Sequence, residues 1–176
     1  FWAERVNYSE NKKAYVILGV TGPNEYENNV NNNWYTNYLA QWCLLYTIKE
    51  ILKIKKMYPQ HWNKIKQKVS WQESEIDKWN QIATQIHFPR HPENDIFLQQ
   101  DDFLDKTIIP ASTIDKSERP INQHWSWDRI LRSPFIKQAD VLQGLFFFEE
   151  NFDYEFIKKH FDFYEPLTVH ESSLSA

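Results

Sequence analysis

Cysteine is almost absent from this sequence, in which Cys43 is the only one among 176 residues. One cysteine cannot close a disulfide within the chain, and the six histidines lack the spacing of metal ligands. The sequence therefore predicts neither a disulfide framework nor a metal site. The lone cysteine is consistent with a reducing, cytoplasmic compartment.

An excess of basic residues is also missing, since 20 lysines and arginines face 24 aspartates and glutamates. The net charge of −4, with the basic residues dispersed, excludes the electrostatic footprint expected of a nucleic-acid or anionic-membrane partner. No apolar run reaches the length of a transmembrane helix. We therefore expect no nucleic-acid partner and no membrane association.

Glycine is scarce, with three residues, whereas aromatic residues reach 16% and include eight tryptophans. A small and mostly polar chain cannot easily bury so many aromatic rings. The chain opens on Phe1 without a charged-then-apolar leader, and its last residues, from His170 on, resemble the first turn of a helix. We expect residues 1–176 to be an internal fragment of a larger protein, cut short by an incomplete record.

Apolar residues recur at helical spacing through most of the chain. A strand or buried extended segment is expected over residues 15–20, followed by a helix over 35–57 with Asn33 or Asn37 as its N-cap. A capping box at 70–73 predicts a further helix that ends before Pro89. An irregular connection follows over 88–124, and the remaining helices are expected at 126–132, 136–149 and 153–163. The sequence predicts an all-α chain without a convincing sheet.

Seven asparagines fall between residues 24 and 37. Short amides compete with the backbone for hydrogen bonds and are poor cover for a core, but they suit a ligand rich in hydroxyl groups. Glu25, Glu27 and three aromatic rings lie in or beside this segment. Together they predict a carbohydrate site, and the alternative is a solvated polar loop.

Glu25 is the better candidate for a catalytic acid. It follows a tight Gly22-Pro23 turn, and Tyr26 could shield it from water so that it stays protonated near neutrality. Glu27, two residues on, either shares the site or points outward.

Two further segments carry groups that could hold sugar hydroxyls in one case and an anion in the other. Lys137-Gln138-Ala139-Asp140 is expected to open a helix and offers a cation beside an amide, which could hold sugar hydroxyls. The segment from His170 to Ser175 places hydroxyls, backbone N–H groups and a histidine at a helix start, which can form an anion pocket. The alternative for that segment is an ordinary serine N-cap.

These segments resemble the inverting disaccharide phosphorylases of glycoside hydrolase family 65. The similarity runs through all 176 residues, and four segments occur in the order that the family has. Four segments in one order are far more specific than any one of them. They are residues 22–37, 137–142, 164–166 and 170–175.

The resemblance implies a fold class and a domain organisation. Residues 1–176 would form the later portion of an (α/α)6-barrel catalytic domain, which makes the chain all-α. Relatives also carry an N-terminal β-sandwich, a helical linker and a small C-terminal sheet domain, all absent from these residues. The full-length parent would be a homodimer.

The resemblance also assigns roles to particular residues. Glu25 would be the proton donor, and inorganic phosphate would be a co-substrate, with no cofactor and no metal. The sugar ligands would be Lys137, Gln138 and Glu165. The phosphate ligands would be His170, Ser172 and Ser173.

The implied reaction is the inverting phosphorolysis of an α-linked glucose disaccharide. Tyr26-Glu27 and the run from Asn31 to Trp34 favour maltose, which would give β-D-glucose 1-phosphate and D-glucose. The alternatives are a phosphorylase for trehalose, kojibiose or nigerose, and a truncated chain that at most binds sugar. A hydrolase of the same family would need a carboxylate base in place of the His170 segment.

Overall fold

The computed structural model of the protein describes residues 1–171, which form two compact units. The first unit comprises residues 1–17 and 37–87, and the second comprises 18–36 and the described residues from 88 on. Within residues 1–171 no helix is both long enough and apolar enough to cross a membrane.

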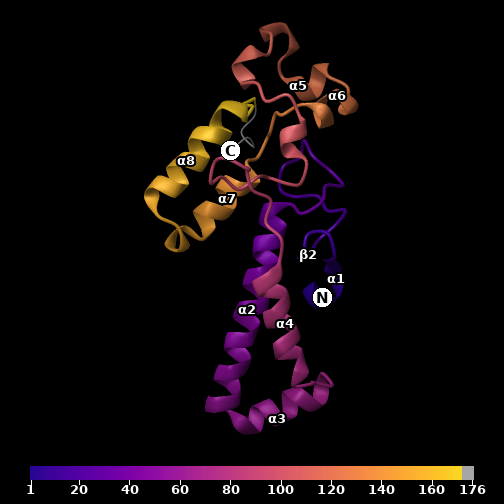
Figure 1. Ribbon diagram of the computed structural model, residues 1–176, viewed down its shortest axis with the longest axis vertical. Coiled ribbons are helices and arrows are strands. Elements are labelled where there is room, and N and C mark those ends of the chain that lie inside the picture. Colours follow the sequence, from indigo (N-terminus) through magenta and orange to yellow (C-terminus); the bar gives the residue numbers. More distant parts are fainter. Residues whose placement is uncertain (172–176) are drawn as a thin grey trace. The chain divides into compact units, whose positions relative to one another are not determined.

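The first unit is a small hairpin with a group of helices (Figure 1). Strands β1 and β2 pair antiparallel, with Tyr8 opposite Tyr15. The expected extended segment is thus confirmed at its start, where Val16 and Ile17 are buried. The elements are α1 (Trp2–Arg5), β1 (Asn7–Ser9), β2 (Ala14–Val16), α2 (Trp34–Met57), α3 (Pro59–Lys68) and α4 (Ser74–Gln85), and the first three residues of α2 belong to the second unit.

Helices α2 and α4 lie side by side (Figure 1). Leu44 of α2 packs against Ile82 and Ala83 of α4, and the Gln41 side chain donates a hydrogen bond of 2.6 Å to the carbonyl oxygen of Ala83. The helix expected over 35–57 is confirmed, and so is its cap. The side-chain oxygen of Asn33 accepts the backbone N–H of Thr36 at 3.0 Å.

Two details of the first unit differ from the prediction. A helix that was not predicted, α3, begins at Pro59, because proline fits the first turn, where its missing N–H costs nothing. The capping box at 70–73 was wrong. Ser70 has a φ of 53°, so the chain turns there, and α4 begins at Ser74 with Glu73 as an N-cap that makes no side-chain bond.

The second unit consists of short helices joined by irregular segments. Two of its helices begin where predicted and are capped there, since Ser126 accepts the N–H of Arg129 and Asp153 accepts the N–H of Phe156. Its helical elements are η1 (Phe103–Asp105), η2 (Ala111–Thr113), η3 (Lys116–Glu118), α5 (Ile121–His124), α6 (Trp127–Arg132), α7 (Asp140–Phe147), η4 (Glu149–Asn151), α8 (Tyr154–Tyr164) and η5 (Glu165–Leu167).

One buried apolar cluster holds several of these segments together, and we call it the Tyr26 cluster. It joins the polar segment near the start of the chain to the irregular connection, to α6 and to the residues after η5. Its members are Tyr26, Ala111, Ile114, Ile121, Ile130, Phe135 and Val169. The expected all-α class is confirmed, because the only sheet among the described residues is the two-stranded hairpin.

Helix α7 begins at Asp140, later than the predicted start at residue 136. The four preceding residues are not helical, because backbone groups of Ile136 and Lys137 bond elsewhere. The Ile136 N–H donates to the Leu167 carbonyl oxygen at 3.1 Å, and the Lys137 N–H donates to the side chain of Asn24 at 2.9 Å. Lys137 and Gln138 therefore lie in a loop in front of α7.

Candidate functional site

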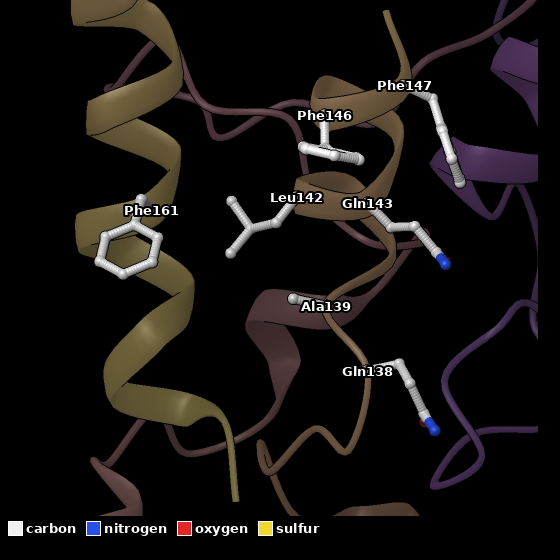
Figure 2. A pocket seen from close by; sticks show the side chains of 7 residues that line it. All are labelled: Gln138, Ala139, Leu142, Gln143, Phe146, Phe147 and Phe161. Atoms are coloured by element: carbon white, nitrogen blue, oxygen red, sulfur yellow. The ribbon is translucent and has the colours of Figure 1, made fainter. Parts of the chain in front are cut away.

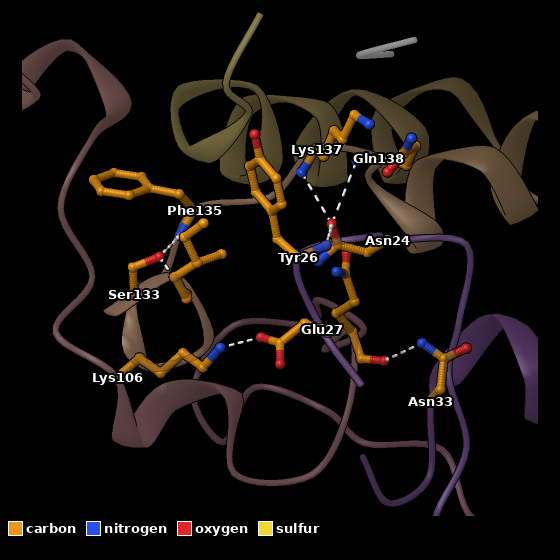
Figure 3. A network of polar contacts seen from close by, with 11 residues as sticks. Asn24, Tyr26, Glu27, Asn33, Lys106, Ser133, Phe135, Lys137 and Gln138 are labelled. Atoms are coloured by element: carbon orange, nitrogen blue, oxygen red, sulfur yellow. Dashed lines mark hydrogen bonds and ion pairs between the residues drawn. The ribbon is translucent and has the colours of Figure 1, made fainter. Parts of the chain in front are cut away.

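Asn24 connects the Glu25 turn to the loop before α7. Its side chain is completely buried. Its Oδ1 atom accepts the backbone N–H groups of Tyr26 at 3.3 Å, Lys137 at 2.9 Å and Gln138 at 3.5 Å (Figure 3). One amide oxygen therefore sets the spacing between two segments that are more than a hundred residues apart.

The connection also runs in the other direction. The side-chain oxygen of Gln138 accepts the backbone N–H of Glu25 at 3.0 Å. The Lys137 ammonium group is ion-paired with the Glu25 carboxylate. The predicted proton donor and two of the predicted sugar ligands thus lie together.

Tyr26 does not shield Glu25, so this part of the prediction was wrong. Tyr26 is 4% exposed and belongs to the apolar cluster, whereas the Glu25 side chain is 56% exposed and faces Lys137. Burial raises the pKa of Tyr26, and the negative charges of Glu171 and Glu25 raise it further. Consecutive residues of the turn therefore point to opposite sides, Tyr26 inward and Glu25 outward.

Glu27 neither shares the Glu25 site nor points outward, contrary to both readings of the sequence. Its side chain is 8% exposed and is ion-paired with Lys106, whose side chain is 14% exposed (Figure 3). A buried carboxylate needs such a partner, because desolvation disfavours its charge. Glu27 therefore anchors the far end of the turn.

The segment after α8 runs beside the loop that carries Lys137. Ile136 pairs with Thr168 in a parallel bridge, and the Val169 N–H donates to the Ile136 carbonyl oxygen at 2.9 Å. Val169 also packs in the same cluster as Tyr26. Because His170 follows Val169 and Glu25 precedes Tyr26, this cluster brings the predicted phosphate segment and the predicted acid into one region.

Glu165 and His170 form a pair within that segment. The Nε2 atom of His170 lies 3.8 Å from Oε1 of Glu165, and both side chains are about half exposed, at 58% and 49%. Ser172 and Ser173, the other predicted phosphate ligands, lie outside the described residues. The structure therefore describes the predicted sugar ligand Glu165 and one of the three predicted phosphate ligands, His170.

Glu171 was missed from the sequence. Its carboxylate is largely buried, accepts the Ile121 N–H at 2.7 Å, and lies 3.9 Å from Nε of Arg119. These contacts tie the residue after His170 to the start of α5. The only sequence signal was its place beside a histidine and two serines.

Several asparagines of the polar segment are structural, which corrects the idea that short amides suit only a ligand pocket. Four of them, Asn24, Asn32, Asn33 and Asn37, are at most 1% exposed. Asn32 donates to Asp101 at 2.7 Å and Asn37 donates to the carbonyl oxygen of His87 at 2.7 Å. Their amides hold the local chain, because buried polar groups need partners.

Asp140 is a second residue that the sequence did not single out. It is 1% exposed at the start of α7, and its Oδ2 atom accepts the Asn33 side chain at 2.7 Å. Burial raises the pKa of Asp140 to about 7, although hydrogen bonds from Asn33 and the Asn24 backbone lower it; the charge of Glu27 adds a smaller upward contribution. The signal for it was a charged residue within an otherwise apolar run.

An apolar hollow of about 420 Å³ lies beside Gln138, between α7 and α8. Figure 2 shows Leu142 pointing from α7 toward Phe161 of α8. Phe146 and Phe147 are 72% and 54% exposed at its border. The sugar-ligand candidate Gln138 therefore sits at the edge of an aromatic surface.

Known proteins are similar to this chain in sequence. The maltose phosphorylase of Bacillus subtilis (strain 168) is 51% identical over 175 residues, which cover 99% of this chain and 22% of that protein. The α,α-trehalose phosphorylase of Thermoanaerobacter brockii is 39% identical over 176 residues, covering 99% of this chain and 23% of the relative. The chain thus spans less than a quarter of the length of these curated relatives.

A solved structure, named as a "putative kojibiose phosphorylase" from the human microbiome, superposes with a TM-score of 0.86 at 35% identity. The match covers 99% of this chain and 24% of that one. It confirms the expected fold class, part of an (α/α)6-barrel catalytic domain. The model of the glycosyl hydrolase family 65 central catalytic domain matches residues 1–176 from end to end. The chain therefore belongs to glycosyl hydrolase family 65, within its central catalytic domain.

Proposed function

We propose that the full-length parent catalyses the inverting phosphorolysis of an α-linked glucose disaccharide, with inorganic phosphate as co-substrate and without a metal or cofactor. One observation carries this proposal. Glu25, the Lys137–Gln138 loop and the segment with Glu165 and His170 converge through direct contacts and one apolar cluster. An acid, a pair of sugar ligands and an anion-binding segment are the parts that such a reaction needs.

The reaction follows from the roles of these groups. The carboxyl group of Glu25 donates its proton to the glycosidic oxygen while the bond between that oxygen and the anomeric carbon breaks. A phosphate oxygen attacks the anomeric carbon from the opposite face, so its configuration inverts. The products are β-D-glucose 1-phosphate and the released sugar. No second carboxylate is needed as a base, because phosphate is already an anion.

Lys137 would have two roles in the cycle. In the free protein its ammonium group is paired with the Glu25 carboxylate. A sugar whose hydroxyls bind Lys137 and Gln138 would separate this pair. The Glu25 carboxyl group would then be free to face the glycosidic oxygen. Glu165 is the third proposed sugar ligand, and His170 with Ser172 and Ser173 would hold phosphate.

Maltose is the proposed substrate. The relative named for maltose is 51% identical, whereas those named for trehalose and kojibiose are 39% and 36% identical. The residues around the acid, Tyr26 and Glu27, agree with this choice. The full-length parent is proposed to be a cytoplasmic homodimer. Residues 1–176 alone are proposed to be inactive, because they expose large apolar side chains such as Phe146 and Phe147.

The deciding experiment incubates the full-length parent with maltose, with and without inorganic phosphate, and follows glucose and β-D-glucose 1-phosphate. Both products should form in equal amounts, and only with phosphate present. Activity with trehalose, kojibiose or nigerose in place of maltose would move the substrate assignment to that disaccharide. Glucose release without sugar phosphate would contradict the phosphorolysis itself.

A further inference from the structure

Asp140 is held by two other segments. Its Oδ2 atom accepts the side-chain N–H of Asn33 at 2.7 Å, and its own backbone N–H donates to the side-chain oxygen of Gln99 at 3.2 Å. The Asn33 amide also donates to the backbone oxygen of Gln99 at 3.2 Å. The carboxylate is therefore fixed in position by the start of α2, the irregular connection and the first residue of α7.

Gly22 allows this carboxylate to reach the backbone of the Glu25 turn. A Cβ atom at Gly22 would lie 2.3 Å from Oδ2 of Asp140 and 2.4 Å from Nδ2 of Asn33. Such separations are far below van der Waals contact, so only glycine fits without a shift. Asp140 thus lies directly against the chain two residues before Asn24.

The path from Asp140 to the proposed acid is short. The Asn24 backbone faces the Asp140 carboxylate and lowers its pKa. The Asn24 side chain in turn accepts the backbone N–H of Tyr26, which follows Glu25, and that of Lys137, which is the ion-pair partner of Glu25. We propose that Asp140 is a positioning residue for Glu25. The charged carboxylate of Asp140 holds the turn that presents Glu25 to Lys137. This inference rests on the proposed role of Glu25.

The surroundings of Asp140 make its charge responsive to pH. The titratable groups that act on it or feel its charge are Glu27, Tyr35 and Tyr164, and none of them is a cation. Burial, with the charge of Glu27 as a smaller contribution, brings its pKa to about 7, and the hydrogen bonds from Asn33 and Asn24 limit the rise. Ionisation of Asp140 therefore lowers the free energy of unfolding as the pH rises through about 7. Groups that are retained although they cost stability are typical of functional sites.

The first test measures the turn directly and needs no activity. Hydrogen exchange is followed in the full-length parent for peptides that contain residues 22–28, in wild type and in Asp140→Asn. Asn is isosteric, but its neutral amide cannot supply the negative charge that the Asn33 side chain and the Asn24 backbone face. Exchange of this segment should become faster at pH 8, and unchanged exchange would overturn the inference whatever the protein catalyses.

Asp101→Asn is the matched control. Asp101 also accepts the side chain of an asparagine in the same polar segment, Asn32, at 2.7 Å. Its described hydrogen bonds run to the Asn32 side chain and, through its backbone N–H, to the Asn31 carbonyl oxygen, both outside residues 22–28. Its substitution removes the same kind of Asn–Asp pair and should leave exchange of residues 22–28 unchanged. Equal acceleration by both variants would mean that any lost pair loosens the turn, and the inference would be wrong.

The second test is kinetic. For phosphorolysis of maltose, Asp140→Asn should lower kcat about 10²-fold, since a displacement of about 1 Å at a reacting group costs that much, with a smaller change in KM. The wild-type kcat should rise with pH around a midpoint near 7, and the kcat of Asp140→Asn should not show this rise. A wild type that makes no sugar phosphate contradicts the proposed function, whereas a variant with wild-type kcat and pH profile contradicts this inference.

A second variant covers the case in which Asp140→Asn does not fold. Asn33→Asp retains the side-chain oxygen that caps α2 by accepting the Thr36 N–H. It removes the donor to Asp140 and places a like charge beside it, which raises the pKa of Asp140. The midpoint of the rise in kcat should move to higher pH. A midpoint at the wild-type position would contradict the inference.

Discussion

The Glu25 carboxylate is ion-paired with the Lys137 ammonium group, although 112 residues separate them in the sequence. The pair is open to solvent on one side, since the Glu25 side chain is 56% exposed and that of Lys137 is 15% exposed. A ligand can therefore enter from the Glu25 side and exchange partners with the lysine. The proposed function makes this exchange the first step of the reaction.

Glu25→Gln should lower phosphorolysis by about 10²- to 10⁴-fold, which is the usual contribution of a positioned acid. The amide cannot give up a proton to the glycosidic oxygen. Folding should be unaffected, because the bond from the Glu25 backbone N–H to Gln138 does not use the carboxylate. Initial rates and the circular dichroism spectrum of the full-length parent check this. Near-wild-type turnover would remove Glu25 from the role of acid.

Lys106→Met should destabilise the protein by about 3–5 kcal/mol, because it leaves the Glu27 carboxylate buried without its partner. Denaturant unfolding measures the loss. The control is Lys13→Met, which breaks an ion pair with Glu10 in which both side chains are more than 70% exposed and should cost under about 1 kcal/mol. Equal effects of the two substitutions would show that Glu27 is not held as described.

Asn24→Asp should lose less stability and activity than Asn24→Ala, because it keeps an oxygen at the position of Oδ1 although it buries a charge. The bonds of this side chain to Tyr26, Lys137 and Gln138 all use Oδ1, and among residues 1–171 its Nδ2 atom has no hydrogen-bond partner. Alanine leaves buried N–H groups unsatisfied, at about 1–3 kcal/mol each. Thermal melts and initial rates of the two variants check the contrast. Equal losses would mean that the Nδ2 atom matters as well.

His160 should make stability depend on pH. Its Nε2 atom accepts the Phe97 N–H at 2.8 Å, so the neutral ring carries its proton on Nδ1, which donates to the Phe156 carbonyl oxygen. Burial lowers the pKa of His160. The folded state therefore binds this proton less readily than the unfolded state, in which the pKa is about 6.5.

The stability contributed by neutral His160 should be present above about pH 6.5 and lost as the pH falls through the folded-state pKa. One such group gives a slope of at most about 1.4 kcal/mol per pH unit. Unfolding free energies between pH 5 and 8 measure it, and His160→Gln should reduce the slope. His91→Gln, on an exposed loop, is the control. The same slope in wild type and His160→Gln would contradict this account.

Much of the fold was readable from local signals. Helices capped by Ser126 and Asp153 begin where predicted, because a cap is a short-range interaction between a side chain and the next turn. The start of α7 was predicted too early, because long-range bonds to Leu167 and Asn24 keep residues 136 and 137 out of the helix. Tertiary partners of this kind leave no periodic trace in the sequence.

The sequence likewise predicted only part of the candidate site. The resemblance to the family singled out Glu25, Lys137 and Gln138, which lie together in the structure. Their roles stay predictions, as do those of Glu165 and the His170 segment. Asp140 and Lys106 were missed because their importance comes from burial and from partners far away in the chain. Spacing along the sequence cannot reveal either property.

The shared acceptor at Asn24 has a consequence for protein engineering. Because one amide oxygen fixes both the Glu25 turn and the residues before α7, these two stretches behave as a single exchangeable module. A chimera that receives only the 22–28 stretch from another family member would join a proposed acid to proposed sugar ligands that come from a different protein. Exchange of substrate preference between such enzymes should therefore move residues 22–28 and 136–140 together.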